Sequence, residues 1–548
     1  MSNRRYSKSS FLDLIGGHHH SSGGFPVARF ALSLLALISF SVLSLSAQSF
    51  PTDDPVLKRL YTVGIDSSQV YELAQPLLDS IGPRLTGSPS IRSGNDWLVA
   101  RYREWGITAK NEQYGSWRAW RRGITHFDLL SPRVRTLEAM MLAWSAPTKG
   151  KVEGKVIILP DVADSAAFRS WLPAVKGNFV LVSYPQPTCR PDSNFKQNAL
   201  PATWDSLQAT RKRGREEWAA RVQRTGATSG DALWSALADA GAAGVVTSLW
   251  SQGWGVDKIF GTRATKAPVV DVSCEDYGLL FRLADRKQSP VVRLETQSEA
   301  LGEQPVFNTI AEIRGTEKPD EYVMLSAHFD SWDGASGATD NGTGTITMLE
   351  AARLLSIAYP KPKRTIIIGH WSGEEQGLNG SRAWAADHPE VVQHLQALFN
   401  QDNGTGRIQT ISTQGLTGAG ALFANWFGKL PTELTADIKL QIPGTPGAGG
   451  TDNASFVCYG APAFGLGSLP WEYFTYTWHT NRDTFDKIVF EEVKQNATLA
   501  AMLVYLASED PQAMPRDRRV MPVDPATGKV RPWPECTKPA RASTESQR

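Results

Sequence analysis

Hydrophobic and polar residues follow different rhythms in different parts of the chain. In residues 53–110 the apolar positions recur three and four residues apart, which is typical of helices with one buried face. Pro76 stands inside one of these runs, where a proline would kink a helix. A turn rich in Pro, Gly and Ser at 82–89 leads to a further helix predicted near 91–106. This part of the chain is therefore predicted to be largely helical.

The middle of the chain, residues 141–300, has shorter patterns of a more β-like kind. Two β-rich runs, at 152–160 and 177–185, each end in proline. Residues 211–224 form a charged helix face, which is usually a solvated surface, and 236–248 predict a helix that leads into a strand. Nothing in this block resembles a catalytic cluster. We expect a separate α/β or β-rich module that is inserted into another domain.

From residue 301 onward, apolar strands alternate with polar loops and helices. Strands are predicted at 322–327, 364–370 and 397–400, and a helix at 346–358. This alternation predicts a mostly parallel sheet that is covered by helices on both faces. In such sheets the chemistry lies in loops beyond the carboxyl ends of the strands. The predicted fold class is therefore α/β, with a mostly parallel, mixed sheet sandwiched between helices.

The first 47 residues have the pattern of a secretory signal peptide. Arg29 precedes an apolar run at 30–43, and small residues follow it up to Ala47, after which we expect cleavage. The run is shorter than the roughly 20 residues that a membrane helix needs, so no stable membrane anchor is expected; an uncleaved anchor is the alternative. Three consecutive histidines at 18–20 would leave with this leader. The chain is thus predicted to be exported, either to the periplasm or as a secreted protein.

These patterns divide the chain into five predicted segments. They are a signal peptide at 1–47, the first part of the main domain at 48–140, the insertion at 141–300, the second part of the main domain at 301–512 and a polar, proline-rich tail at 513–548.

The charge balance gives no reason to expect nucleic acid as a partner. The 57 Lys and Arg residues nearly balance the 55 Asp and Glu residues, for a formal net charge of +2. The leader carries all of that excess, so the rest of the chain is close to neutral and lacks the basic surface of a nucleic-acid-binding protein. The 18 tryptophans suit a large core with aromatic-lined clefts.

The four cysteines do not form a metal or redox motif. They lie too far apart for a zinc ribbon or a Cys-x-x-Cys site. In an exported chain Cys189 could pair with Cys274, although the sequence alone does not fix the connectivity. Cys458 lies in an apolar context, where a buried and inert thiol is expected.

Histidines and carboxylates recur at the ends of the predicted strands from 301 onward. A lone His at a strand end is usually structural, an isolated Glu pair is usually surface charge, and Asp in Asp-Asn-Gly usually forms a turn. Their combination in one order is harder to explain without chemistry, and a set of His and carboxylates without Cys suits a hydrolytic zinc site. His370 ends an apolar strand without a spaced partner, so we interpret it as a supporting or structural residue. The candidate residues are His328, Asp330, Asp340, Glu374, Glu375, Asp402 and His479.

Five motifs in this order resemble the co-catalytic dizinc exopeptidase family. The motifs are His-x-Asp at 328–330, Asp340 in a Gly-rich turn, Gly-Glu-Glu-x-Gly-Leu-x-Gly-Ser at 373–381, Asp402 after the next strand and His-Thr-x-x-Asp-Thr at 479–484. The family includes bacterial leucyl aminopeptidases and the glutamate carboxypeptidases, and the stretch at 328–333 is most similar to the carboxypeptidase Q-like branch. The catalytic resemblance covers about 301–505. The block at 141–300 resembles, less specifically, the protease-associated domain that several members carry as an insertion.

The resemblance implies two Zn²⁺ per chain and assigns a ligand role to five residues. Asp340 would bridge the two ions. His328 and Asp402 would complete the coordination of one ion. Glu375 and His479 would complete that of the other.

The resemblance also implies how the reaction would proceed. A hydroxide that bridges the metals would attack the peptide bond, with Glu374 as the general base that later returns the proton to the leaving amine. Neighbouring side chains point in different directions, so Glu375 can be a ligand while Glu374 stays free. Asp330 would accept the second N–H of His328 and fix its tautomer. The predicted substrates are short peptides or dipeptides.

The sequence departs from the family at one position, and two further residues have more than one interpretation. Relatives often carry Ser-Asp-His where this chain has Asp452 and Asn453, so Asn453 replaces a histidine on the substrate side. Asp452 either supports the site or caps a helix. Trp478 either lines the substrate pocket or packs in the core. Asp483 is expected to orient a neighbour.

Three functions are compatible with this fold. The first is an exported metallo-exopeptidase, whether aminopeptidase, dipeptidase or carboxypeptidase. The second is a glutaminyl cyclase-like enzyme, which shares the turn at 337–340 but not the Glu-Glu motif at 374–375. The third is a non-catalytic binding protein, which the complete set of ligand positions disfavours. The insertion could cover the cleft, restrict substrate length or mediate dimerisation, so a homodimer is an open alternative.

Overall fold

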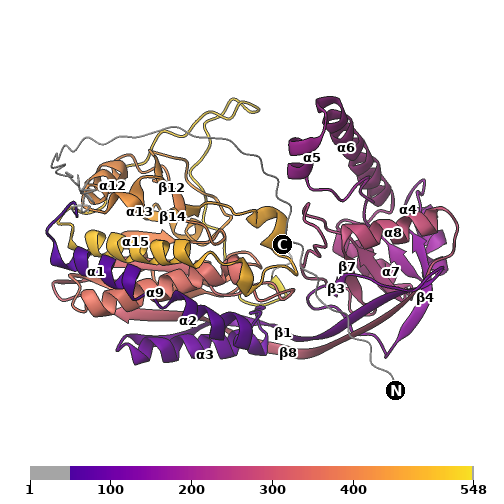
Figure 1. Ribbon diagram of the computed structural model, residues 1–548, viewed down its shortest axis with the longest axis horizontal. Coiled ribbons are helices and arrows are strands. Elements are labelled where there is room, and N and C mark those ends of the chain that lie inside the picture. The colour runs from indigo at the N-terminus through magenta and orange to yellow at the C-terminus, as the bar shows by residue number, and fades with distance from the viewer. Residues whose placement is uncertain (1–49, 546–548) are drawn as a thin grey trace, which may run out of the picture. The chain divides into compact units, whose positions relative to one another are not determined.

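The structure is a computed structural model that describes residues 50–545 of the chain (Figure 1). In these residues, fourteen strands form one mixed sheet. The predicted signal peptide and the three leader histidines lie outside these residues. Among the described residues, no helix combines the length and the apolar character that crossing a membrane requires. The sheet has two halves that meet at strand β8 (Val291–Ile313), and each half has its own core.

The first half of the sheet has the predicted mixed and mostly parallel arrangement. Strand β9 pairs in parallel with β10 on one side and with β11 on the other, and β14 extends the parallel set beyond β11. Strands β8 and β12 run antiparallel to their neighbours in this set. In spatial order the strands are β13 (Lys439–Gln441), β12 (Ile408–Ser412), β14 (Ala463–Ser468), β11 (Leu395–Asn400), β9 (Lys318–His328), β10 (Arg364–Trp371) and β8 (Val291–Ile313).

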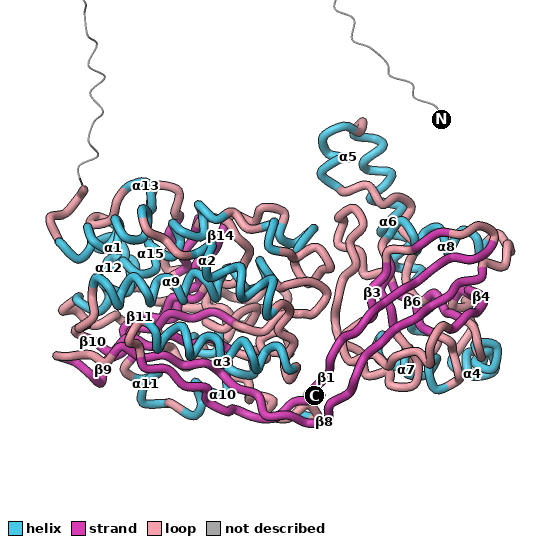
Figure 2. The backbone as a smooth tube through the Cα atoms, turned by 60° about the horizontal axis from the view of Figure 1, so that its bottom comes forward, coloured by secondary structure: helices cyan, strands magenta, loops and turns pink. Residues whose placement is uncertain are grey.

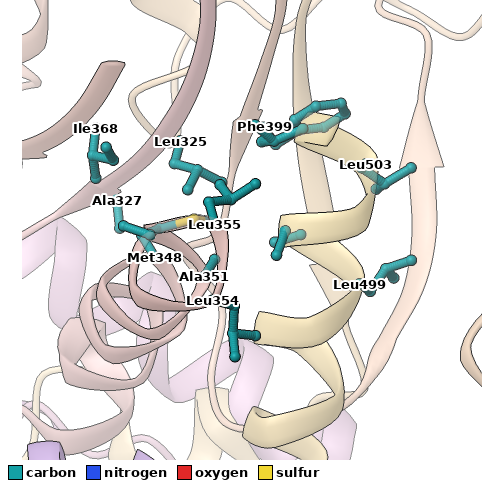
Figure 3. Packing of buried hydrophobic residues seen from close by; sticks show 14 of the residues in the cluster. Leu325, Ala327, Met348, Ala351, Leu354, Leu355, Ile368, Phe399, Leu499 and Leu503 are labelled. Carbon is teal, nitrogen blue, oxygen red and sulfur yellow. The ribbon is translucent and has the colours of Figure 1, made fainter. Parts of the chain in front are cut away.

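Alternate residues of the central strands face two layers of helices, as the apolar runs predict. Leu325 and Ala327 point to one layer, where α9 and α15 pack against the sheet (Figure 3). Met324, which precedes Leu325, belongs to the cluster on the opposite face. The first layer contains α1 (Pro55–Asp66), α2 (Val70–Gln75), α3 (Pro89–Glu104), α9 (Thr343–Ala358), α12 (Ala419–Phe427), α13 (Thr432–Thr435) and α15 (Phe490–Glu509), and the second contains α10 (Asn379–Asp387), α11 (Pro389–Gln393) and α14 (Ala454–Val457).

The ends of the first helices follow from local sequence. The carboxylate of Asp54 accepts hydrogen bonds from the backbone N–H groups of Val56 and Leu57, which α1 leaves unsatisfied at its first turn. Pro76 interrupts the next predicted helix as expected: α2 ends at Gln75, and the chain continues as a π-helical turn, η1 (Pro76–Ile81). The helix predicted near 91–106 is α3.

The second half of the sheet is built from the middle of the chain. Strands β1 (Thr108–Ser131) and β8 pair antiparallel along almost their whole length and run from the first half into the second (Figure 2). The sequence did not indicate strands of this length. The other elements are β2 (Arg135–Thr136), β3 (Ala139–Met141), β4 (Val152–Ile158), α4 (Ser165–Trp171), η2 (Leu172–Val175), β5 (Phe179–Leu181), α5 (Asp192–Asn198), α6 (Pro201–Arg224), α7 (Gly230–Asp239), β6 (Gly244–Thr247), β7 (Val269–Val272) and α8 (Cys274–Asp285).

This second half has the α/β character that the sequence predicts for the insertion. Strands β4, β5, β6 and β7 are parallel to one another, and helices pack against them. The exact limits at 141 and 300 and the likeness to a protease-associated domain stay predictions. One detail of this segment was wrong: Arg211, expected on a solvated helix face, is 2% exposed and forms an ion pair with Asp192.

All four cysteines form disulfides. Cys189 pairs with Cys274, which is the pairing considered from the sequence. Cys458 pairs with Cys536 in the tail, so the expectation of an inert thiol at Cys458 was wrong. The apolar residues around Cys458 gave no sign of a partner 78 residues away. Disulfides are typical of proteins that fold in an oxidising compartment.

The remaining elements are short turns and an irregular tail. η3 (Ala338–Gly342), η4 (Tyr473–Thr477) and η5 (Phe485–Lys487) are single turns near the candidate site. Beyond α15 the described tail has only isolated bridges, and Trp533 anchors it by donating a hydrogen bond to the carbonyl of Val457.

Candidate metal centre

The parallel strands bring most of the candidate residues to one edge of the sheet. His328 is the last residue of β9, the Glu374–Glu375 pair follows β10, and Asp402 follows β11. Because these three strands are parallel neighbours, their carboxyl ends lie at the same edge. Asp340 reaches this edge from the η3 turn before α9. His328 and Asp402, which are 74 positions apart in the sequence, thus come within contact distance of each other.

His328, Asp340 and Asp402 form the first of two groups with the spacing of metal ligands. We call it half-site A. The Nε2 atom of His328 lies 3.0 Å from Oδ1 of Asp402 and 3.5 Å from Oδ1 of Asp340. The three ligand atoms all lie within 4.8 Å of one another.

Asp340, Glu375 and His479 form the second group, half-site B. The Nε2 atom of His479 lies 2.9 Å from Oε2 of Glu375 and 3.2 Å from Oδ2 of Asp340. Asp340 thus turns one carboxylate oxygen toward each half-site, as a bridging ligand must. All five residues that the resemblance assigns as ligands are placed in these two groups.

Glu374 belongs to neither half-site but lies beside both. Its carboxylate forms a further ligand-spaced group with His328 of half-site A and Glu375 of half-site B. It also lines the same cavity as Asp340 and Asp402. This is the position that a proton-transferring residue needs.

The protonation of the site reflects an excess of buried negative charge. Burial raises the pKa of Glu374 well above its usual value, and the nearby carboxylates of Asp402 and Glu375 raise it further. Burial by itself lowers the pKa of His479, but the carboxylates of Glu375 and Asp340 outweigh it and raise that pKa to about 9. These shifts show that the buried carboxylates of the site favour positive charge beside them.

The donor set fits a pair of divalent metal ions. Oδ2 of Asp340 and Oε1 of Glu375 are buried without a hydrogen-bond partner among the described residues, which is costly for a carboxylate oxygen unless a cation lies beside it. Two histidines and three carboxylates, with no thiolate, are ligands that Zn²⁺ accepts in hydrolytic sites.

Asp330 supports the site in a way that differs in part from the prediction. The Nδ1 atom of His328 lies 3.0 Å from the backbone carbonyl oxygen of Asp330, whereas the Asp330 carboxylate is 3.7 Å away, beyond hydrogen-bond range. That carboxylate instead accepts hydrogen bonds from the backbone N–H groups of Glu374 and Glu375, at 3.1 and 3.2 Å. Asp330 thus fixes His328 through its main chain and holds the Glu-Glu turn through its side chain.

Asp483 orients Asp340, in line with the role expected from the sequence. Its Oδ2 atom accepts a hydrogen bond from the backbone N–H of Asp340 at 3.0 Å, and its Oδ1 atom accepts one from that of Thr339 at 2.8 Å. A second support, Arg84, was not indicated by any sequence pattern. Its buried guanidinium donates to the carbonyls of Phe329, Gly82, Ser336 and Gly337 and so braces the loop between His328 and Asp340.

His479 is held by a loop from the middle of the chain. The backbone N–H of Ile259 donates to the carbonyl of His479 at 2.7 Å, and the rings of Phe260 and Trp332 lie 5.0 and 6.0 Å from its imidazole. Asp257 and Asn481 exchange further hydrogen bonds beside it. These contacts hold His479 in the left-handed backbone region, with φ +59°, which a residue other than glycine rarely adopts.

The half-sites open into a cavity of about 610 Å³. Trp478 lines it, and its ring lies against that of His479, tilted by 30° with ring centres 4.0 Å apart. Trp478 therefore forms a wall of the pocket and is not part of the core. Arg382 of α10 also lines this cavity. Sequence reasoning missed Arg382, and the only available signal was its place at the end of the Gly-Glu-Glu motif. The part played by Phe260 had no signal at all.

Three further residues settle the alternatives left open by the sequence. Asp452 is fully buried, and neither of its carboxylate oxygens has a hydrogen-bond partner among the described residues, so it does not cap α14. Burial raises the pKa of Asp452 to about 7. Asn453 is buried, and its side-chain amide faces the carbonyl of Ala463. His370 is a structural residue, since its Nε2 atom hydrogen-bonds the buried Tyr102 hydroxyl at 2.6 Å.

Comparisons with known proteins agree with this geometry. Residues 308–504 match the model of Peptidase family M28. The chain is 24% identical to carboxypeptidase Q of Mus musculus over 459 residues, which cover 83% of this chain and 89% of that protein.

Solved structures share the fold over most of the chain. A Peptidase M28 precursor from Shewanella amazonensis SB2B superposes with a TM-score of 0.62 at 25% identity, covering 87% of this chain and 98% of that chain. A zinc aminopeptidase from Bacillus subtilis has a TM-score of 0.50 at 20% identity, covering 82% and 97%. These matches confirm the predicted fold class and the family resemblance.

Proposed function

We propose that this chain, a metallo-exopeptidase hydrolase that resembles the dizinc peptidases of family M28, cleaves short peptides or dipeptides with two zinc ions and with Glu374 as general base. The observation that carries the proposal is the pair of ligand groups that share Asp340, with Glu374 beside both. A structural zinc site does not require a buried carboxylate that lies beside both ligand groups and lines a cavity.

The five ligand residues would hold the metal ions. Half-site A would bind one Zn²⁺ and half-site B the other, with Asp340 in common. When bound, Zn²⁺ lowers the pKa of water and polarises a carbonyl group.

Glu374 would move the proton during the reaction. As a carboxylate it accepts a proton from the attacking water, and as a carboxylic acid it donates that proton to the amine of the leaving residue. The position of Glu374 beside both ligand groups and in the lining of the cavity supports this exchange. The hydrogen bonds from the Glu374 and Glu375 main chain to Asp330 hold the carboxyl group in place.

Export and the role of the insertion belong to the same proposal. Two disulfides fit an oxidising compartment outside the cytoplasm. The predicted signal peptide would direct the chain there. We further propose that the middle segment is a protease-associated-like domain whose loop completes half-site B; homodimer formation stays a prediction.

The experiment is a substrate panel with the zinc-loaded protein and its Glu374→Gln variant. The panel contains free dipeptides, amino-terminally blocked peptides and aminoacyl anilides. We expect turnover of unblocked dipeptides by the unaltered protein, and a loss of about 10²- to 10⁴-fold in kcat in Glu374→Gln with the zinc content retained. Glu390→Gln, an exposed carboxylate outside the site, is the matched control. No turnover of any panel member by the protein with two bound zinc ions would disprove the peptidase.

A further inference from the structure

We propose that Arg382 binds the free α-carboxylate of the substrate's carboxyl-terminal residue, so that the enzyme acts on short peptides whose leaving residue ends in a carboxylate. This inference rests on the proposed peptidase function and specifies its substrate class. Arg382 lies on α10 and lines the same cavity as Glu374 and the half-sites. It is the one lysine or arginine among the described residues that line this cavity.

The guanidinium of Arg382 is available to a ligand. Its one hydrogen bond within the described chain runs from Nη1 to the carbonyl of Gly377 at 2.8 Å. The carboxylates of Asp452 and Glu374 act on the guanidinium electrostatically, but neither is its hydrogen-bond partner. The Nε and Nη2 donors are therefore left for another acceptor. Lys258, a cation close to the site, is different: it is 7% exposed, donates to the carbonyl of Trp478 and lies over the Trp478 ring.

Two hydrogen bonds tie Arg382 to the turn that carries the general base. Gly377 donates its backbone N–H to the carbonyl of Glu374 at 2.7 Å, and the carbonyl of Gly377 accepts from Arg382. Arg382 thus stands on the Glu374 side of the cavity. Trp478 and Phe474, by contrast, bring an aromatic surface into the cavity from the η4 segment and the residues that follow it.

This placement matches the chemistry of the leaving group. Glu374 delivers its proton to the leaving amine, and in a dipeptide the α-carboxylate is separated from that amine by a single carbon atom. The guanidinium of an arginine donates two parallel hydrogen bonds to a carboxylate. It binds the neutral amide of the same residue more weakly, because the amide carries no charge and has only one acceptor oxygen. A carboxylate on Arg382 would therefore place the leaving nitrogen near Glu374, as in a dipeptidase or a carboxypeptidase.

The test compares alanyl-leucine with its carboxyl-terminal amide, using the zinc-loaded full chain. We measure kcat and KM for both compounds with the unaltered protein, Arg382→Gln and Arg382→Lys. We expect the unaltered protein to favour the free acid by roughly 10- to 100-fold in kcat/KM. Arg382→Gln should raise KM for the acid by about the same factor and leave the amide unchanged, and Arg382→Lys should retain part of the preference.

The controls separate this inference from the function on which it rests. Arg121→Gln removes an exposed arginine that pairs with Glu299 outside the cavity, and Glu535→Gln removes a carboxylate that lines the crevice behind Arg382; both should keep the preference for the acid. If the unaltered protein cleaves neither compound, the proposed function fails. If it cleaves both equally well, or if Arg382→Gln slows both equally with zinc retained, the carboxylate site is wrong and the peptidase stands. Should Arg382→Gln not fold, Arg382→Lys carries the same test, with a selective rise in KM for the acid expected.

Discussion

The two half-sites differ in how the chain builds them. In half-site A, His328 and Asp402 come at or just after the ends of two buried, adjacent parallel strands, and the Nδ1 atom of His328 has a backbone partner in Asp330. In half-site B, Glu375 also follows a central strand. His479, however, stands in a loop with a left-handed backbone, and its Nδ1 atom is buried without a hydrogen-bond partner among the described residues.

The difference shows that the two ligand groups of one candidate metal centre can depend on two kinds of structure. The ends of β9 and β11 fix half-site A, because the sheet holds both strands in register. His479 takes its place through the loop at 257–260, which belongs to the other half of the sheet. We therefore expect changes in the middle segment to weaken half-site B and to spare half-site A.

The largest effect is expected from Asp340→Ala, because this residue faces both half-sites. We expect the unaltered protein to bind about two zinc ions and the variant to bind close to none. The variant should also lose more activity than the roughly 10- to 100-fold typical of residues that only support a ligand. Zinc content after dialysis, measured by elemental analysis, together with dipeptide turnover checks this. Asp402→Ala is the comparison: it removes a ligand of half-site A alone, so about one ion should remain.

One outcome would contradict the shared role of Asp340 in the two half-sites. If Asp340→Ala keeps about one tightly bound zinc ion, Asp340 does not bridge and the half-sites are independent. Asp320→Ala, a change at an exposed carboxylate, should leave zinc content and turnover unchanged.

The same contrast explains what the sequence could and could not predict. The alternation of apolar strands and helices predicts the parallel sheet. Parallel strands place their following loops at one edge, so the sequence alone was enough to group His328, Glu374 and Asp402. The resemblance to a family supplied the ligand role of His479, whose loop has no periodic pattern. Phe260 and Arg84 were missed because their contacts join segments more than 200 positions apart, and neither lies in a motif.

Two corrections have the same physical origin. Cys458 appeared to be a buried thiol because its neighbours are apolar, but a disulfide depends on a partner that local composition does not reveal. Arg211 was predicted to be solvent-exposed because its helix is charged, but it is buried and forms an ion pair with Asp192 of another helix. Local patterns predict elements and faces; contacts between distant segments decide which polar groups are buried.

An intermediate effect is expected from Phe260→Ala, which removes the ring that lies 5.0 Å from the His479 imidazole. Groups that orient a ligand change metal affinity by about 10- to 100-fold. We expect a loss of this size at half-site B and an unchanged affinity at half-site A. A zinc titration should therefore resolve one tight and one weakened ion, and a competing chelator of known affinity would quantify both.

A matched phenylalanine in the same half of the sheet makes this result specific. Phe281 packs against Trp218, and its substitution by alanine should leave both zinc affinities unchanged. Asn481→Ala, which breaks the hydrogen bonds to Asp257, should act like Phe260→Ala. Equal weakening of both half-sites in Phe260→Ala would show that the loop at 257–260 does not single out His479.

The smallest effect concerns an ion pair remote from both half-sites. Nε2 of His388 lies 2.6 Å from Oε1 of Glu112, and both side chains are about one quarter exposed. The hydrogen bond with Glu112 raises the pKa of His388, and the hydrogen bond with His388 lowers the pKa of Glu112 to about 2. The stability that His388 contributes is complete below its unfolded pKa, near 6.5, and is lost as the pH rises through its raised folded value. The contribution of Glu112 is complete above its unfolded pKa, near 4.5, and is lost as the pH falls toward 2.

The pair should therefore stabilise the chain most between about pH 4.5 and 6.5. His388→Gln should lower the free energy of unfolding by up to ~1 kcal/mol in this window, since solvent screens a partly exposed pair, and by progressively less in alkaline solution. Denaturant unfolding at pH 5.5 and pH 9 checks this, with His394→Gln, at an exposed histidine of the same region, as the control. Zinc affinity measured on the same samples then tests the comparison. If His388→Gln lowers the zinc affinity of half-site B as Phe260→Ala does, the sensitivity of that half-site reflects the overall stability of the chain. If the zinc affinities stay unchanged while the free energy of unfolding falls, the dependence of His479 on the loop at 257–260 is a local property of that contact.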